Sequence, residues 1–229
     1  MLTTDRRFPA MKAGPLRSRV VNLLKDAIFS GKLEPGEALP EIRLARELQV
    51  SQATVREALV QLEQLGLVVR EANRGTHVTR FSAREIEERA QLRILLEGEA
   101  MEQAARQCTE GDYERLMALQ AAFEEKIDGD DHFGRIEADL AFHRYIWERS
   151  GNTTLLRMLE QLTTPLFAFT CILRSRKIVT SRIVVNPHAR LLEAMRAGDR
   201  ELMRQRIREH IETSFAAFLR AQAGHETDT

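Results

Sequence analysis

Hydrophobic residues recur every three or four positions between Ser51 and Gly66, as they do on one face of a helix. Ser51 can cap the start of this helix, and Gly66 stands where a glycine commonly ends one. A shorter apolar face precedes it over residues 41–48, so the pattern predicts two short helices joined by a tight turn. Such a pair is either a helix-turn-helix or an ordinary helical hairpin, and these residues alone leave both open. The apolar positions of the second helix are Val55, Ala58, Leu59, Leu62 and Leu65.

The flanking segments favour the helix-turn-helix. A further amphipathic helix is predicted from Pro15 to Gly31. After the pair, two β-branched runs at 67–70 and 76–79 flank a loop with Asn-Arg-Gly at 73–75, which is typical of a β-hairpin. A helix, a helix-turn-helix and a hairpin in this order predict a winged helix, whose second helix would enter the major groove of DNA.

Beyond Arg80 the pattern is almost entirely helical. Ser82 and Glu85 have the spacing of a capping box that opens a long helix, and Pro165 predicts a kink in a later one. The sequence therefore predicts a mainly α protein, with an N-terminal winged helix-turn-helix and an all-α six-helix bundle. The six helices are expected at about 82–108, 109–128, 130–150, 153–174, 186–197 and 199–221.

These elements suggest four parts of the chain. We expect a flexible arm at 1–14, a DNA-binding domain at 15–80, a helical domain at 81–223 and a loose polar tail at 224–229. Within the helical domain, a loop is expected at 176–185.

Composition and charge agree with this division. The 229 residues include 34 basic and 34 acidic side chains, and 43% are hydrophobic, enough to bury a core in each of two domains. Residues 1–80 hold 13 basic and nine acidic side chains. The small positive excess lies with the predicted DNA reader and permits phosphate binding without demonstrating it.

Other sequence signals favour a cytoplasmic protein without a membrane partner. Cys108 and Cys171 are far apart and lack metal or redox spacing, which fits a reducing compartment. No apolar run approaches the roughly 18 residues of a membrane span, and the first residues lack the apolar stretch of a signal peptide.

The N-terminal motif resembles a known family. From Leu16 to Val78 the chain contains "G.L.PG..L.E..LA..L.VS..TVREAL..L...GLV......G..V", which is similar to the DNA-binding domain of the GntR superfamily of bacterial transcription regulators. The resemblance implies a homodimer on a palindromic operator in double-stranded DNA. It implies DNA contacts by Arg43, Gln52, Thr54, Arg56, Asn73, Arg74 and Gly75.

Gln52 departs from the family, because many members carry arginine there. Arginine favours guanine and glutamine suits adenine, so base preference at that position is open. The residues themselves also allow plainer roles, with Arg56 in an ion pair with Glu57 or another neighbour and Arg43 on a solvated helix face.

Four residues of the helical domain have metal-ligand chemistry. Asp139 and His143 are four apart, so they lie one turn apart on one helix face and can chelate one ion. His188 is expected in the first turn of the fifth helix and His210 in the middle of the sixth. A nitrogen-and-oxygen set of this kind suits zinc, nickel, iron or manganese. From the residues alone, a single histidine in a helix is more often an ordinary hydrogen-bonded or exposed residue, and Asp139 could simply hydrogen-bond His143.

A second resemblance bears on these four residues. The sequences "DLAFHRYI…SGN", "PHARLLEAMRAGD" and "MRQRIREHI" are similar to the FCD ligand-binding domain of the FadR branch of GntR regulators, here in its shorter, six-helix VanR-like version. The metal-binding version of that domain supplies one Asp and three His. The resemblance thus implies a divalent transition metal, with zinc favoured, bound by Asp139, His143, His188 and His210.

A small organic acid is the expected effector. Four protein ligands leave coordination positions that a carboxylate can fill. Arg93 matches a family position that faces the pocket and can hold a carboxylate through two hydrogen bonds, although its spacing from Glu97 equally allows an ion pair. Asn152 is a second, weaker candidate for effector binding.

The leading hypothesis is therefore a non-enzymatic transcriptional regulator whose operator affinity a small carboxylate controls, with repression expected from the family resemblance. Two alternatives remain. One is a metal-responsive sensor, in which the ion itself is the signal. The other is a metal-dependent hydrolase, which the absence of an evident general base beside the four ligands disfavours.

Overall fold

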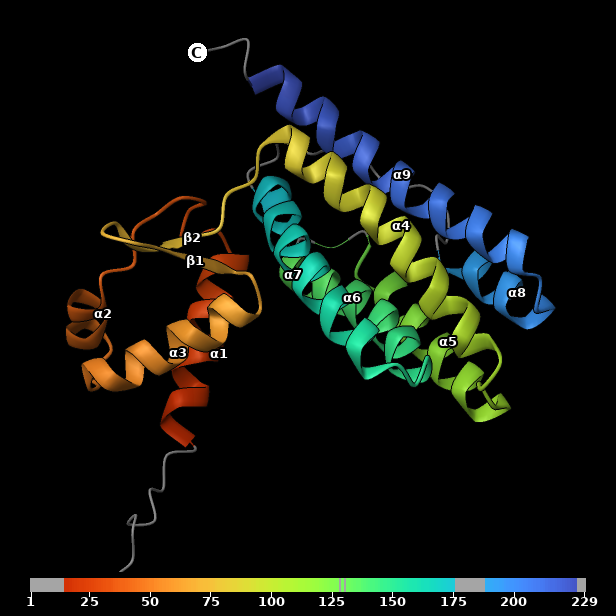
Figure 1. The fold of residues 1–229 in the computed structure, drawn as a ribbon, viewed down its shortest axis with the longest axis horizontal. Helices are drawn as coiled ribbons and strands as arrows, with labels where there is room; N and C mark the ends of the chain where they lie inside the picture. The colour runs from red at the N-terminus through yellow and green to blue at the C-terminus, as the bar shows by residue number, and fades with distance from the viewer. Residues whose placement is uncertain (1–14, 128, 130, 176–187, 226–229) are drawn as a thin grey trace, which may run out of the picture.

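The computed structural model describes residues 15–127, 129, 131–175 and 188–225, which form a small N-terminal domain and a larger helical domain (Figure 1). The N-terminal elements are α1 (Pro15–Phe29), α2 (Glu41–Glu47), α3 (Gln52–Gln64), β1 (Val68–Glu71) and β2 (Gly75–Val78). The helical domain contains α4 (Ala83–Ala105), α5 (Glu110–Glu124), α6 (His132–Arg149), α7 (Thr153–Ser175), α8 (Ala189–Ala197) and α9 (Arg200–His225). A winged helix-turn-helix followed by six helices is confirmed.

Local signals fix the ends of α3. The Ser51 hydroxyl accepts a hydrogen bond from the Thr54 amide at 3.1 Å, as an N-cap does. Gly66 follows the helix with a φ of +70°, in the left-handed region that glycine occupies without a steric penalty. Both predicted boundaries are confirmed, since each depends only on neighbouring residues.

The wing is a two-stranded antiparallel hairpin. Val68 pairs with Val78 and Glu71 with Gly75 at its tip. Asn73 and Gly75 both have positive φ, which a tight turn requires and which Asn and Gly tolerate best. The Leu39 amide donates to the carbonyl of Thr76 at 2.8 Å, which fastens the wing to the segment before α2.

The N-terminal core forms between α1 and α3. The predicted apolar face of α3 is confirmed, because Val55, Leu59 and Leu62 are fully buried. They pack with Leu24 and Ile28 of α1 in one hydrophobic cluster. The opposite face of α3 is thereby left exposed to solvent.

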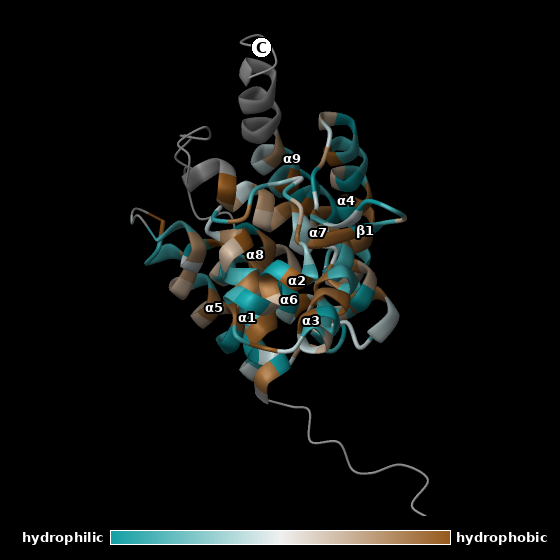
Figure 2. Ribbon diagram, turned by 90° about the vertical axis from the view of Figure 1, so that its left-hand side faces the viewer, coloured by the Kyte–Doolittle hydropathy of each residue, from teal (hydrophilic) through white to brown (hydrophobic). Residues whose placement is uncertain are grey.

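In the helical domain, α4 and α9 run side by side along much of their length (Figure 1). The predicted capping box at Ser82 and Glu85 opens α4, and Thr109 with Asp112 forms another at α5. Hydrophobic and hydrophilic residues mix along the helices (Figure 2). Among the described residues, none of the helices combines the length and apolar character needed to span a membrane.

Some helix ends differ from the expected ones. α5 stops at Glu124, short of the predicted end, whereas α9 continues to His225, beyond residue 221 and into the predicted tail. Gln222 and Ala223, both good helix formers, allow the helix to continue past residue 221. Pro165 lies inside α7, and its kink stays a prediction. The predicted arm at 1–14, the loop at 176–185 and the cap at 186–187 lie outside the described residues.

The two domains share a hydrophobic core. Ile136 of α6 and Phe167, Ala168 and Cys171 of α7 belong to the same buried cluster as the α1 and α3 residues. At the edge of this contact, the rings of Phe29 and Phe133 pack edge to face, with their centroids 5.7 Å apart. The N-terminal domain therefore packs directly against α6 and α7, and α6 carries two of the four candidate metal ligands.

Candidate functional site

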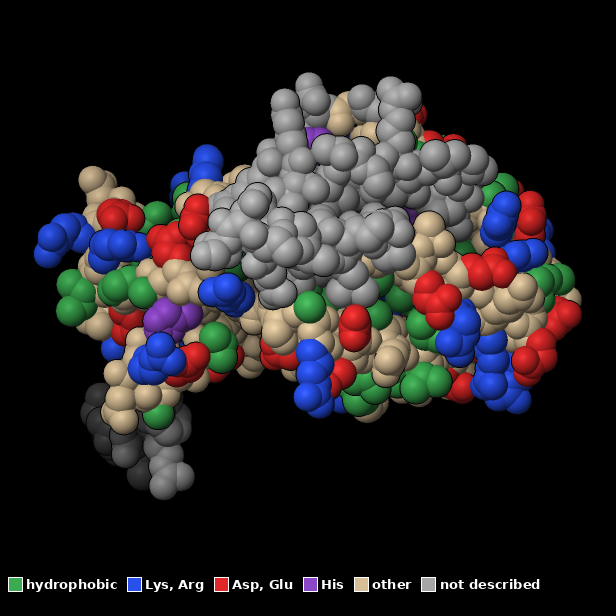
Figure 3. Space-filling view, turned by 90° about the horizontal axis from the view of Figure 1, so that it is seen from above, with side chains coloured by type: hydrophobic (Ala, Val, Ile, Leu, Met, Phe, Trp, Pro, Cys, Tyr) green, Lys and Arg blue, Asp and Glu red, His purple; other side chains and the backbone are tan. Residues whose placement is uncertain are grey.

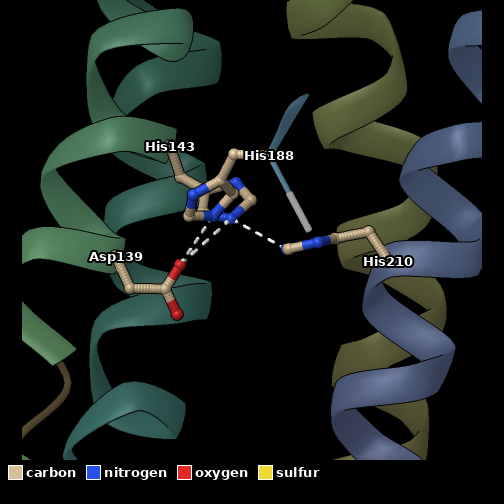
Figure 4. Close-up of side chains that lie close together, drawn as sticks. All are labelled: Asp139, His143, His188 and His210. Carbon is tan, nitrogen blue, oxygen red and sulfur yellow. Dashed lines mark hydrogen bonds and ion pairs between the residues drawn. The ribbon is translucent and has the colours of Figure 1, made fainter. Parts of the chain in front are cut away.

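The four predicted metal ligands converge in the helical domain (Figure 4). Asp139 and His143 lie one turn apart on α6, His188 immediately precedes α8, and His210 projects from α9. His188 Nε2 is 2.9 Å from Asp139 Oδ1, and His143 Nε2 is 3.0 Å from His210 Nε2. One ligand atom from each residue lies within 4.8 Å of all the others. The spacing along α6 is local, but only the packing of three segments produces the cluster.

The protonation states favour metal binding. Burial lowers the pKa of His188 and holds that of His210 well below its ordinary value, so both rings are neutral at pH 7. Burial alone would raise the pKa of Asp139, but the hydrogen bond from His188 brings it below its usual range. Neutral imidazole nitrogens and an ionised carboxylate are the forms that bind a metal.

The donor set fits a divalent transition metal. Zinc bonds to nitrogen and carboxylate oxygen at about 2.0–2.2 Å, so two ligand atoms of one tetrahedral ion lie about 3.4 Å apart. The Nδ1 atoms of His188 and His210 are buried and find no hydrogen-bond partner among the described residues. The Nε2 atoms of the three histidines instead face one another and the Asp139 carboxylate, and this convergence of nitrogen and oxygen donors suits a bound ion.

Packing holds the rings in place. The His188 ring stacks on Phe142 of α6 with a centroid distance of 4.0 Å, and Phe123 of α5 lies at 4.8 Å on another side. Because aromatic stacking fixes the plane of the ring, His188 keeps its position ahead of α8 without a side-chain cap.

Glu97 of α4 contacts the cluster through His143, whereas its spacing in the sequence suggested only an ion pair with Arg93. Its carboxylate accepts from His143 Nδ1 at 2.8 Å and from Arg93 Nε at 2.7 Å. Burial alone would raise its pKa, but Arg93 and His143 lower it to about 2. An ionised Glu97 requires the proton on His143 Nδ1, which leaves Nε2 as the metal-facing atom.

A small cavity opens beside the cluster. Its volume of about 50 Å³ holds a few water-sized groups. The lining combines hydrophobic side chains with cations and hydroxyls, which is typical of a pocket for a small polar ligand. The lining residues are Arg93, Arg135, Ile136, Leu166, Phe167, Thr170, His210, Ile211, Ser214 and Phe215.

The two predicted effector contacts differ in position. Arg93 lines the cavity, as an effector contact would, and it also forms the ion pair with Glu97. Asn152 is exposed and does not line the cavity, and its Oδ1 instead accepts from the Leu155 amide at 3.0 Å at the start of α7. Arg135 was missed, although its position four residues before Asp139 places it on the same face of α6.

The predicted DNA contacts lie on exposed parts of the N-terminal domain. Arg56 and Gln52 project from α3, and both donate to Glu41 of α2. Arg56 therefore pairs with a residue of α2 rather than with Glu57, the partner suggested by the sequence. Arg43 lies near Glu37, at 3.4 Å.

The wing tip also lies at the surface. Asn73, Arg74 and Gly75 are all exposed, and Arg74 is paired with Glu71 at 2.8 Å. Thr54 is partly buried, and its hydroxyl forms a hydrogen bond with that of the N-cap Ser51 at 2.8 Å. Basic side chains protrude at this end of the molecule, interspersed with acidic ones (Figure 3).

Comparison with known families and proteins agrees with this architecture. Residues 16–78 match the family of bacterial regulatory proteins, gntR family, and residues 88–213 match the FCD domain. The chain is 29% identical to the uncharacterized HTH-type transcriptional regulator YdhC of Bacillus subtilis, over 89% of this chain and 91% of that protein. It is 30% identical to the HTH-type transcriptional regulator LutR of the same organism, over 75% of this chain and 87% of that protein.

The solved structure of Escherichia coli McbR/YncC has the same arrangement, with a TM-score of 0.76 and 26% identity over 92% of this chain and all of that one. A further relative, at 28% identity over 90% of this chain and 88% of that protein, is the probable D-xylose utilization operon transcriptional repressor of Paenarthrobacter nicotinovorans. With its winged helix-turn-helix and its FCD domain both matched, the chain belongs to the GntR family of bacterial transcription regulators.

Proposed function

We propose that this regulator changes its operator affinity when a small carboxylate binds beside a metal held by Asp139, His143, His188 and His210. The observation that carries the proposal is the cavity between this cluster and the interdomain core. Its wall includes Ile136 and Phe167, which also belong to the buried cluster shared with the DNA-binding domain. A ligand in the cavity would therefore contact side chains that also pack against the DNA-binding domain.

The lining supports an anionic ligand. Arg93 and Arg135 bring two guanidinium groups to one small space. The hydroxyls of Thr170 and Ser214 also line it, but each donates its hydrogen to a carbonyl of its own helix, so the guanidinium groups are the donors suited to an anion. Guanidinium binds carboxylate through two parallel hydrogen bonds, which gives geometric selectivity as well as attraction. A divalent ion, when bound, would supply open coordination positions for a carboxylate oxygen. The volume of about 50 Å³ suits a small ligand.

The route to the DNA-binding domain is short. Ile136 precedes Asp139 by one helical turn on α6, and Phe167 lies on α7 with its ring centroid 5.2 Å from the Arg93 guanidinium. Both side chains also contact the core beneath α1 and α3. A ligand that prefers one placement of these side chains would change DNA affinity by the coupling free energy between the two sites.

The working form would be a homodimer. A single winged helix reads only a few base pairs, whereas two related by a two-fold axis match a palindromic operator. The P. nicotinovorans relative is named a probable repressor, and repression relieved by the ligand is the mode we propose here.

The decisive experiment follows ligand and DNA binding together. A duplex is first selected by the full-length protein from a randomised library, and the metal content of the purified protein is measured. Acetate, lactate, malonate and succinate are then titrated while melting temperature and duplex affinity are recorded, with acetamide and lactamide as uncharged controls. We expect one carboxylate to raise the melting temperature and change duplex affinity, while the amides do neither.

Two results would overturn the proposal. If buffered zinc or manganese alone changes duplex affinity and no carboxylate alters it further, the ion itself is the signal. If neither metal nor carboxylate changes duplex affinity, the helical domain does not control DNA binding through this site.

A further inference from the structure

The carboxylate of Glu41, the first residue of α2, connects the two helices of the helix-turn-helix. Arg56 donates from Nε to both carboxylate oxygens, at 3.1 and 3.0 Å, and from Nη2 to Oε2 at 2.8 Å. Gln52 Nε2 donates to the same Oε2 at 3.0 Å. One acidic side chain therefore holds two residues of the exposed face of α3, one turn apart.

The contacts with Glu41 leave part of the Arg56 guanidinium and part of the Gln52 amide available to hydrogen-bond a base. Glu41 occupies the side of the guanidinium formed by Nε and Nη2, so the Nη1 group and the outer Nη2 hydrogen still form a fork. Such a fork matches the O6 and N7 acceptors of guanine in the major groove. For Gln52, one amide hydrogen is used, and its oxygen and second hydrogen remain to contact a base.

The position of the Glu41 carboxylate does more than stabilise its own helix. It lies in the first turn of α2, where a negative charge is favourable, and from there it reaches two side chains of α3. The Glu41 side chain is 21% exposed, against 56% for Arg56. The hydrogen bond from Arg56 lowers the pKa of Glu41, so the carboxylate is charged at pH 7.

A restrained arginine reads bases more selectively than a mobile one. A free arginine loses side-chain entropy on binding and can turn to a phosphate or to a neighbouring base instead. The bidentate pair with Glu41 removes much of that freedom before DNA binds. It also places a negative charge beside the reading face, which opposes indiscriminate binding to phosphates.

We infer that Glu41 is a positioning residue for base recognition, because its carboxylate orients Arg56 and Gln52 together for one segment of the operator. It need not touch DNA itself. The inference rests on α3 being the DNA-reading helix, as family membership implies, and it is independent of the effector site. Its chemical partner is a major-groove edge that offers guanine acceptors, next to a base pair that Gln52 reads.

The test compares sequence selection by full-length variants on randomised duplexes at matched salt. Glu41→Gln keeps the size of the side chain but removes the charge that holds Arg56. We expect it to lose about tenfold or more of the discrimination at the base pairs read by α3, with affinity for unselected duplex unchanged or higher. Glu41→Asp, which keeps the charge on a shorter side chain, should retain part of the discrimination.

Two further variants serve as controls. Glu57→Gln makes the same charge change on the exposed face of α3, where no described contact joins Glu57 to Gln52 or Arg56, and it should leave the selected sequence as in the parent. Arg56→Ala should lose the same base preference as Glu41→Gln. Melting temperatures show whether each variant is folded.

The outcomes separate the possibilities. If Glu41→Gln binds the selected duplex more tightly with unchanged base preference, Glu41 merely competes with DNA and the inference is wrong. The same holds if Glu57→Gln reproduces the effect of Glu41→Gln. If Arg56→Ala also keeps full selectivity, then the assignment of α3 as the base-reading helix fails as well.

Discussion

Gly66, which follows the last turn of α3, lies directly against Pro165 of α7. A Cβ atom built on Gly66 would be 2.8 Å from Pro165 Cγ and 3.2 Å from the carbonyl oxygen of Gln161. Its φ of +70° is a second reason for glycine at this position. The end of the candidate DNA-reading helix thus contacts the helical domain with no room for a side chain.

We expect Gly66→Ala to destabilise the protein by more than the left-handed backbone alone explains. That conformation costs a non-glycine residue about 1–2 kcal/mol, and the contact with Pro165 adds to it. Gly198→Ala is the matched control, because Gly198 has a φ of +65° and no atom within 4 Å of the added Cβ. Chemical denaturation of both variants checks this, and equal losses of stability would show that the interdomain contact adjusts freely.

Ile136→Val should weaken the coupling between ligand and DNA binding. Removing one buried methyl group costs about 0.5–1.5 kcal/mol of stability, so the protein stays folded. Ile136 lines the cavity and joins the shared core, whereas Ile146 on the same helix is equally buried, at 4% exposed, in the core of the helical domain. Ile146→Val should therefore cost similar stability but keep the full change in duplex affinity on carboxylate addition. If carboxylate addition changes duplex affinity equally in both variants, the coupling does not pass through Ile136.

Glu97→Gln should lower metal affinity by about 10–100-fold, the usual effect of losing a carboxylate that orients a metal-bound histidine. The reason is that His143 Nδ1 loses its charged acceptor. Glu102→Gln provides the control, since Glu102 is a buried acid on the same helix that pairs with Arg200 and Arg204, away from the cluster. Competition with a chromogenic chelator measures both. Equal metal affinities in the two variants would exclude the orienting role of Glu97.

Removal of metal should lower the melting temperature, because an ion that binds only the folded state stabilises it by mass action. His143→Ala should abolish this difference between metal-loaded and chelator-treated protein. His132→Gln, at the start of the same helix but outside the cluster, should preserve it. Calorimetry with parallel metal analysis tests this, and full metal stoichiometry in His143→Ala would remove the proposed site.

Much of the fold was predictable because its signals are local. The apolar face of α3, its Ser51 cap and the capping box at Ser82 depend on residues within a few positions of one another. The pairing of Asp139 and His143 likewise follows from a spacing of four on one helix. The match of His188 and His210 to this pair came from a family resemblance, and spacing alone left it open.

Other features of the candidate sites were not predictable from local patterns. Glu41 and Arg56 are 15 residues apart, and their contact depends on how α2 crosses α3. Glu97 reaches His143 from another helix, and the cavity forms where side chains of α4, α6, α7 and α9 meet. Asn152 shows the reverse case, because its side chain bonds the start of its own helix rather than the cavity.

The sequence by itself determined the order of the elements, the winged helix and the residue types available for metal chemistry, since propensity, capping and periodicity act over short distances along the chain. Tertiary structure decided which charges are paired, which histidine has a carboxylate behind it and which side chains join the cavity to the DNA-binding domain. These relationships depend on the packing of helices distant in sequence, where burial makes each contact both specific and energetically important.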